Sequence, residues 1–195
     1  MGLILIFFGK NATGKSALIE NTQKRLGLNV AHTRRLLAET NQTKTEKELL
    51  IQYEKQSQDA YLDVIRHKLV KKRKNEGLII EGPFSVEEIR KIQSFFPKDQ
   101  TVLIQLTSDS RLRISRLAAR HNLTSRQAYK HMHQSDQLRQ KKGIESLERI
   151  SDIILSNNSG LEELYKQFHE KSLNHQRQNL LTVLRNKIQK TRLRK

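Results

Sequence analysis

The feature that most constrains the fold is a glycine-containing segment that directly follows an apolar run near the N-terminus. The apolar run is Leu3–Phe8, and Gly9–Ser16, with the sequence GKNATGKS, follows it without a gap. A continuous apolar run of this length is typical of a central strand in a parallel sheet, because helices cover both of its faces. Gly9–Ser16 fits the pattern G-x-x-x-x-G-K-[ST], whose backbone N–H groups converge on phosphate oxygens. The chain is therefore expected to begin with a strand, a phosphate-binding loop and a helix.

Each residue type in this loop has a physical role. Lys15 is expected to reach the β- and γ-phosphates of ATP, and the Ser16 hydroxyl is expected to ligate Mg²⁺. The helix that starts here directs the positive end of its dipole at the same anion. The alternative is a chance match, without function, in a loop that contains glycine and lysine. The residues predicted to bind the nucleotide are Gly9, Asn11, Ala12, Thr13, Gly14, Lys15 and Ser16.

Strands and helices alternate along the rest of the chain. Further strands are expected at 28–31, 78–80, 101–106 and 152–155. Helices are expected at 15–25, 46–74, 86–95, 109–121 and 124–141, and from about Leu161 onward. This order is typical of an α/β fold with a parallel sheet of four or five strands.

Composition excludes several classes of protein. The chain has no cysteine, which excludes a disulfide framework, a thiolate zinc site and a cysteine nucleophile. The run Leu3–Phe8 is far shorter than the roughly 20 residues needed to cross a bilayer, and it lacks the flanks of a signal peptide. We therefore expect a cytoplasmic protein without a membrane span.

The charge is strongly positive and uneven. The 37 Lys and Arg residues outnumber 20 Asp and Glu, which gives a formal net charge of +17 and favours phosphate-bearing partners. Residues 171–195 contain eight of these cations and no acid. We expect this segment to be a basic helical extension that contacts nucleic acid, an anionic surface or a partner helix. A solvated terminus without a partner is the alternative.

Two further features fit a site for phosphoryl transfer. Glu81 ends the apolar strand at 78–80, where a carboxylate faces Mg²⁺ through water in proteins with this loop; a simple loop cap is the alternative. Arg113, Arg116 and Arg120 are spaced by three and four residues, so they share one helix face. Such a face neutralises charge during phosphoryl transfer, whereas the alternative is a solvated basic surface.

Taken in order, five segments carry a family resemblance: Gly9–Ser16, Glu81–Gly82, Ser108–Arg120, Asp136–Gly143 and Ser151–Asn157. Over residues 1 to about 170 the chain resembles the P-loop nucleoside monophosphate kinase-like family. It is most similar to the branch of dephospho-coenzyme A kinase and the archaeal adenylate-kinase-like proteins. The resemblance implies a three-layer fold with a five-stranded parallel sheet, an acceptor-binding helical insert at about 40–75 and a lid at about 109–126. It also implies transfer of the γ-phosphoryl group from ATP–Mg²⁺ to a small, nucleotide-like acceptor.

The resemblance also assigns roles by position. It makes Arg113, Arg116 and Arg120 the lid arginines, Asp136 and Arg139 a charged pair near the acceptor, and Asn157 part of the loop that touches adenine. These are expectations that the resemblance carries, in addition to the roles given to Lys15, Ser16 and Glu81 above.

The chain departs from the family pattern in the acceptor region. His32 stands where these kinases often have an acid, while Arg35 matches the arginine three residues later. An imidazole is a base near neutral pH, so we predict His32 as a candidate general base; a surface or packing role is the alternative. No arginine follows Glu81–Gly82 directly, and Arg90 is the nearest cation. Three functions stay open: a small-molecule kinase, a nucleic-acid-directed kinase or ATPase, and a non-catalytic nucleotide-binding module.

Overall fold

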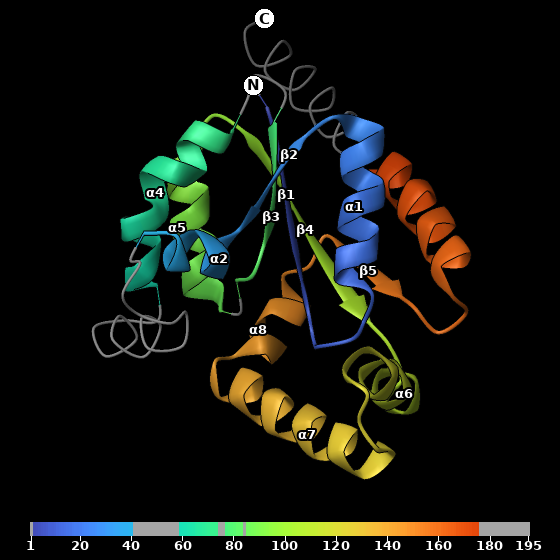
Figure 1. Ribbon diagram of the computed structural model, residues 1–195. Helices are drawn as coiled ribbons and strands as arrows, with labels where there is room; N and C mark the ends of the chain where they lie inside the picture. The colour runs from blue at the N-terminus through green and yellow to red at the C-terminus, as the bar shows by residue number, and fades with distance from the viewer. Residues whose placement is uncertain (1, 41–58, 74–76, 84, 176–195) are drawn as a thin grey trace, which may run out of the picture.

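The computed structural model describes residues 2–40, 59–73, 77–83 and 85–175, and Figure 1 shows their arrangement. Five strands form one all-parallel sheet in the order β2-β3-β1-β4-β5. The strands are β1 (Leu3–Gly9), β2 (Asn29–His32), β3 (Gly77–Glu81), β4 (Gln100–Thr107) and β5 (Ile153–Ser156). The predicted α/β fold with a five-stranded parallel sheet is confirmed.

Helices follow the strands in turn. They are α1 (Lys15–Leu26), α2 (Thr33–Ala38), α4 (Ala60–Lys72), α5 (Val86–Phe95), α6 (Ser110–His121), α7 (Ser125–Lys141), α8 (Ile144–Arg149) and a last helix over 161–175. The short helices α2 and α8 were not predicted, because six residues are too few for a helical period to stand out.

The alternation along β1 explains the three layers. Ile4, Ile6 and Phe8 pack in a buried cluster that includes residues of α2, α4 and α5. Leu5 and Phe7 point to the opposite face, where α1 and helix 161–175 cover them. Figure 1 shows these two helical layers on either side of the sheet. Both faces of the strand are thus buried, which is why its sequence is continuously apolar.

The hairpin of α6 and α7 lies at the carboxyl ends of the strands, at the bottom of Figure 1. Leu117 on α6 packs against Ala128 and Met132 on α7, and Ala12 of the phosphate-binding loop joins the same cluster. A capping box fixes the start of α7: the Gln127 N–H donates to Thr124 Oγ1, and the Thr124 N–H donates to Gln127 Oε1. The hairpin therefore rests directly on the loop.

Some predicted segments lie partly or wholly outside the described residues. Of the expected insert at about 40–75, the structure describes 59–73, and α4 occupies most of it. The expected basic extension begins within helix 161–175, and its residues 176–195 are not described. In the part of the chain that is described, no helix is long and apolar enough to cross a membrane.

Gly77 provides a test of the sheet. It has a φ of +142°, and a Cβ built there would lie 1.9 Å from the carbonyl oxygen of Leu3 on the neighbouring strand. We expect Gly77→Ala to lower the free energy of unfolding by at least about 2 kcal/mol more than Gly27→Ala. Gly27 is the matched control: its φ is +66°, with no atom within 4 Å of the added Cβ, so only the left-handed backbone costs about 1–2 kcal/mol. Urea unfolding of both variants measures the difference, and equal losses would contradict the close strand contact.

Candidate active site

The phosphate-binding loop joins the end of β1 to the start of α1. Gly14 has a φ of +98°, and a Cβ built there would meet Asn157 Nδ2 at 2.2 Å, so glycine is required at this position. No side chain caps α1, and its first turn contains no acid. The first bond of the helix is donated by the Leu18 N–H to Gly14 O, which leaves the N–H groups of Lys15, Ser16 and Ala17 directed outward. This helix end fits an anion.

Every carbonyl oxygen from Gly9 to Thr13 accepts a hydrogen bond from a side chain. Lys15 Nζ donates to Gly9 O at 3.0 Å and to Lys10 O at 2.9 Å. Thr13 Oγ1 also donates to Lys10 O, at 3.0 Å. Because the carbonyl and the N–H of a peptide point in opposite directions, fixing these oxygens also fixes which way the loop's N–H groups face.

Two arginines of α6 hold the middle of the loop. Arg113 is buried; its Nε donates to Asn11 O at 2.8 Å, and its other two nitrogens form a bidentate pair with Asp136 on α7 at 2.8 and 2.6 Å. Arg116 donates to Ala12 O at 3.3 Å and to Asn157 O at 2.9 Å. In this conformation both guanidinium groups support the loop, and their predicted lid role stays a prediction.

Arg139 on α7 and Asn157 after β5 hold the two ends of the loop. Arg139 donates to Gly9 O at 2.6 Å and also to the side-chain oxygen of Asn11. Asn157 is buried, and its amide donates to Thr13 O at 2.9 Å. The family resemblance assigned Asn157 to an adenine contact and Arg139 to the acceptor. In the structure both residues hold the loop backbone, and their predicted ligand contacts stay predictions.

A cavity of about 240 Å³ lies beside the loop. Its walls come from the end of β1, the start of α2, the end of β3 and α7. The lining residues that carry charge or hydrogen-bonding side chains are Asn11, Lys15, His32, Arg34, Arg35, Glu81 and Arg139. Predicted catalytic and acceptor residues from distant parts of the sequence therefore meet in one place.

His32 and Glu81 form a hydrogen-bonded pair in this cavity. The two residues lie opposite each other at the ends of the neighbouring strands β2 and β3. His32 Nδ1 and Glu81 Oε2 are 2.8 Å apart. Burial raises the pKa of Glu81, but the hydrogen bond from His32 and the charge of Lys15 outweigh it, so the pKa of Glu81 lies below its usual value. An ionised Glu81 accepts a hydrogen bond from Nδ1–H, and this tautomer carries the lone pair of the imidazole on Nε2.

Several cations line the same cavity. The pKa of Lys15 is lowered to about 7, because its ammonium group is desolvated and the charge of Arg139 is nearby. Desolvation and the nearby charge of Arg34 lower the pKa of Arg139 to about 10. These groups stabilise a bound anion and repel one another without it. The cavity therefore fits a ligand with several negative charges.

The two arginines that begin α2 differ in placement. Arg35, which the family pattern selects, has a side chain that is 76% exposed and forms an ion pair with Glu39 at 3.3 Å. Arg34 is half-buried, lines the cavity and lies close enough to Arg139 to lower its pKa. Sequence reasoning missed Arg34, although the adjacent pair of arginines after β2 was the available signal.

Three other predicted residues lie at the surface. Ser16 is exposed in the first turn of α1, next to the uncapped helix end. Arg120 is exposed in the last turn of α6, yet close enough to lower the pKa of Lys15. Arg90 is exposed on α5 and is not among the residues that line the cavity, so its predicted contact with the acceptor is not supported.

Ser16 and Glu81 are the candidate ligands for a metal ion. Among the described residues, no group of three or more His, Asp or Glu side chains forms a metal cluster. Ser16 at the helix start and the carboxylate of Glu81 fit the sparse coordination of Mg²⁺, which keeps several waters and is completed by substrate phosphates. The residues present therefore fit the predicted ATP–Mg²⁺ complex.

The comparisons with solved structures agree with this architecture. A gluconokinase from Sinorhizobium meliloti covers 93% of this chain and 96% of its own, with a TM-score of 0.61 and 14% identity. A shikimate kinase from Bacteroides thetaiotaomicron covers 93% and 98%, with a TM-score of 0.54 and 15% identity. An uncharacterised protein from Eubacterium ventriosum covers 89% of this chain and 99% of its own, with a TM-score of 0.59 and 14% identity. The chain shares its fold with these proteins.

The sequence comparisons match less of the chain than the structural ones. No protein-family model matches the chain. A protein described as UPF0200 from Thermococcus onnurineus is 26% identical over 98 residues, which are 50% of this chain and 53% of the relative. The chain thus matches about half the length of this curated relative, and the dephospho-coenzyme A kinase branch that the sequence suggested is not confirmed.

The buried Arg113–Asp136 pair gives a test of the loop's support. Asp136→Asn leaves a guanidinium that is 3% exposed without its counter-charge, and we expect a loss of about 3–5 kcal/mol in the free energy of unfolding. Glu20→Gln is the matched control, because its ion pair with Lys24 is 65–73% exposed and such pairs contribute about 0–1 kcal/mol. Thermal and urea unfolding give both values. A loss for Asp136→Asn no larger than for the control would contradict the structural role of the pair.

Lys15 makes stability depend on pH. With a folded pKa of about 7 against 10.5 in the unfolded chain, the unfolded state binds more protons between these values, so stability rises with pH through this window. We expect Lys15→Met to raise the free energy of unfolding at pH 7, on the order of 2–4 kcal/mol, and by much less at pH 10. Lys24→Met, at an exposed site in the same helix, is the control. Identical pH profiles for wild type and Lys15→Met would overturn the assignment.

Proposed function

We propose that this protein is a phosphotransferase that moves the γ-phosphoryl group of ATP–Mg²⁺ to the hydroxyl group of a small acceptor. The observation that carries the proposal is the single cavity in which the loop lysine, Arg139 and the His32–Glu81 pair meet. The uncapped start of α1 supports a phosphate donor on the loop side of this cavity. The fold shared with a gluconokinase and a shikimate kinase agrees with this chemistry.

In this proposal the position of each residue determines its role. Lys15 and Arg139 lie where they neutralise charge on the transferred group, and Ser16 and Glu81 would hold Mg²⁺, the latter through water. When bound, ATP–Mg²⁺ supplies the phosphoryl group and screens its negative charge. Arg120, exposed at the end of α6 and close enough to lower the pKa of Lys15, would contact the bound phosphates.

His32 serves the acceptor side. Its Nδ1–H donates to Glu81, so Nε2 is free to take the proton of the acceptor hydroxyl as the oxygen bonds to phosphorus. The bond from phosphorus to the bridging oxygen breaks, and ADP leaves. Glu81 fixes the tautomer and stabilises the protonated imidazole, as a buried carboxylate does for a histidine base in other enzymes.

The charges of the cavity select the acceptor. Arg34 and Arg35 begin α2 beside His32, which places cations next to the reacting hydroxyl. An acceptor that carries an anionic group near its hydroxyl therefore fits. Nucleotides and dephospho-coenzyme A meet this requirement, and so do gluconate and shikimate, after which two of the structural neighbours are named. The volume of about 240 Å³ favours the smaller of these compounds.

An acceptor panel with ATP labelled in its γ-phosphate tests the proposal. The panel holds nucleoside monophosphates, nucleosides, dephospho-coenzyme A, gluconate, shikimate and oligonucleotides with a 5′-hydroxyl. We expect label on a small anionic acceptor, and a loss of about 10²–10³-fold in kcat for Lys15→Met. We expect His32→Asn to lower kcat by about 10²-fold with little change in the KM for ATP.

Two controls make these outcomes specific. His67→Asn changes an exposed histidine of α4 that does not line the cavity, and it should leave the rate unchanged. ATP binding is measured in parallel by calorimetry. Bound ATP with no labelled acceptor would instead support a nucleotide-binding module, and label only on oligonucleotides would support a kinase of nucleic-acid ends.

A further inference from the structure

The positive charge of this chain is concentrated in two segments. Residues 110–142 contain nine Lys and Arg residues and one acid, for a net charge of +8. Residues 171–195 contribute another +8, so the rest of the chain carries only +1 of the total of +17. The first of these segments is the α6–α7 hairpin, which the structure describes completely.

The nucleotide site uses only part of the hairpin's charge. Arg113, Arg116 and Arg139 point inward and bond the loop carbonyls. The single acid, Asp136, is held by the buried Arg113. No exposed acid lies between 110 and 142, and the nearest exposed ones, Asp109 and Glu145, stand at its ends. The outward-facing charge of the hairpin is therefore positive throughout.

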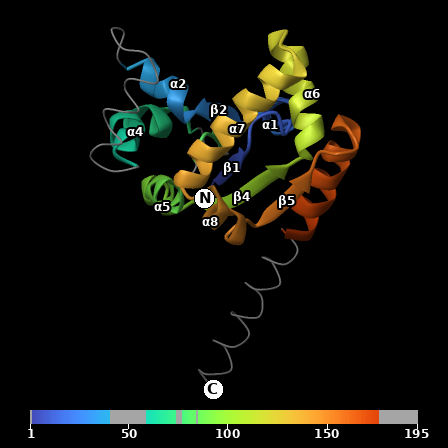
Figure 2. The ribbon, with the colours of Figure 1, turned by 90° about the horizontal axis from the view of Figure 1, so that it is seen from below.

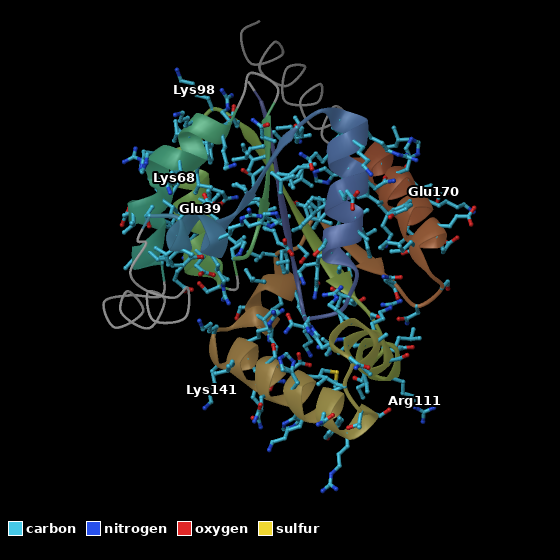
Figure 3. All side chains as sticks on the ribbon, viewed as in Figure 1. Glu39, Lys68, Lys98, Arg111, Lys141 and Glu170 are labelled. Atoms are coloured by element: carbon cyan, nitrogen blue, oxygen red, sulfur yellow. The ribbon has the colours of Figure 1, made fainter. Side chains whose placement is uncertain are left out.

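The outer face of α7 has a regular pattern. Arg126, Lys130 and His133 are spaced by four and three residues, so they share one face, and all three are exposed. Lys141 continues this side of the helix near its end, and Figure 3 shows Lys141 and Arg111 extending outward from the two helices of the hairpin. In Figure 2, α7 crosses the side of the molecule that is seen from below. The 17 residues of α7 give a basic surface about 25 Å long.

An aromatic group lies within this surface. Tyr129 is 53% exposed, and its ring is stacked on that of His133 with 5.9 Å between centroids and 26° between planes. An exposed tyrosine between cations does not contribute to the hydrophobic core. It offers a flat face to an unpaired base, which is how single-stranded nucleic acid is bound without sequence readout.

We propose that the outer face of the α6–α7 hairpin binds single-stranded nucleic acid, with its phosphates on Arg126 and Lys130 and a base on Tyr129. Complementary charge supplies the attraction, and the exposed ring distinguishes a strand with unpaired bases from a duplex, in which the bases are stacked on one another. The surface faces away from the cavity, so this binding does not depend on the proposed phosphotransferase activity.

Fluorescence anisotropy of the full chain with a labelled oligo-dT of about 16 nucleotides tests the proposal. We expect Arg126→Gln with Lys130→Gln to weaken binding by at least about tenfold and to lower the slope of log K against log salt by about 1.4. We expect Tyr129→Ala to weaken binding by about 5- to 100-fold without changing that slope. Binding to a duplex of the same length should be weaker and insensitive to Tyr129→Ala.

The matched control removes the same charge elsewhere. Lys71→Gln with Lys98→Gln changes two exposed lysines away from the hairpin, and Figure 3 shows Lys98 at the opposite end of the molecule. This control should shift the affinity by less than about twofold.

An equal loss in both double variants would show general charge attraction and overturn the proposal. Unchanged binding in the hairpin variants would move the site elsewhere, including to residues 171–195. Binding to vesicles of anionic lipid as tight as to oligo-dT would overturn it in favour of a membrane surface. Thermal melting confirms that each variant is folded.

Discussion

The structure depends on how the carbonyl oxygens of the phosphate-binding loop are held. Five consecutive carbonyls, from Gly9 to Thr13, accept side-chain hydrogen bonds, and most donors come from α6, α7 and the segment after β5. Because each donor fixes one peptide plane, the loop is organised without a ligand, which lowers the ordering cost of binding. The α6–α7 hairpin thus acts as a scaffold of the loop.

The same arrangement has an electrostatic cost. Lys15, Arg139 and Arg34 face a shared cavity, and the lowered pKa values of Lys15 and Arg139 record their desolvation and mutual repulsion. Glu81 is the carboxylate in that cavity and offsets only part of this charge. A bound phosphate would offset the rest. The site therefore destabilises the free protein, which is common at functional sites.

The sequence predicted what depends on local pattern. The apolar run, the glycines and the helical periods place β1, the loop and all but two of the labelled helices, and the order of elements predicts the parallel sheet. It did not predict which groups hold the loop, because Arg113, Arg116 and Asn157 lie 102, 104 and 144 residues from their carbonyl acceptors. Nor did it distinguish Arg34 from Arg35: adjacent residues of a helix point about 100° apart, and the packing of α2 leaves Arg34 half-buried and Arg35 exposed, although both line the cavity.

Helical geometry also explains how one hairpin carries charged groups that face the loop and others that face outward. On α7, Asp136 and Arg139 are three residues apart and face the loop, while Arg126, Lys130 and His133 follow the same period on the opposite side. Inward guanidinium groups are fixed by carbonyls and a carboxylate, so their exchange for another residue disturbs the loop. The outward groups are exposed and take no part in holding the loop, so nothing in the fold of the described residues requires them to be basic. A uniform positive sign at positions that packing leaves unconstrained is what the proposed contact with a nucleic acid would explain.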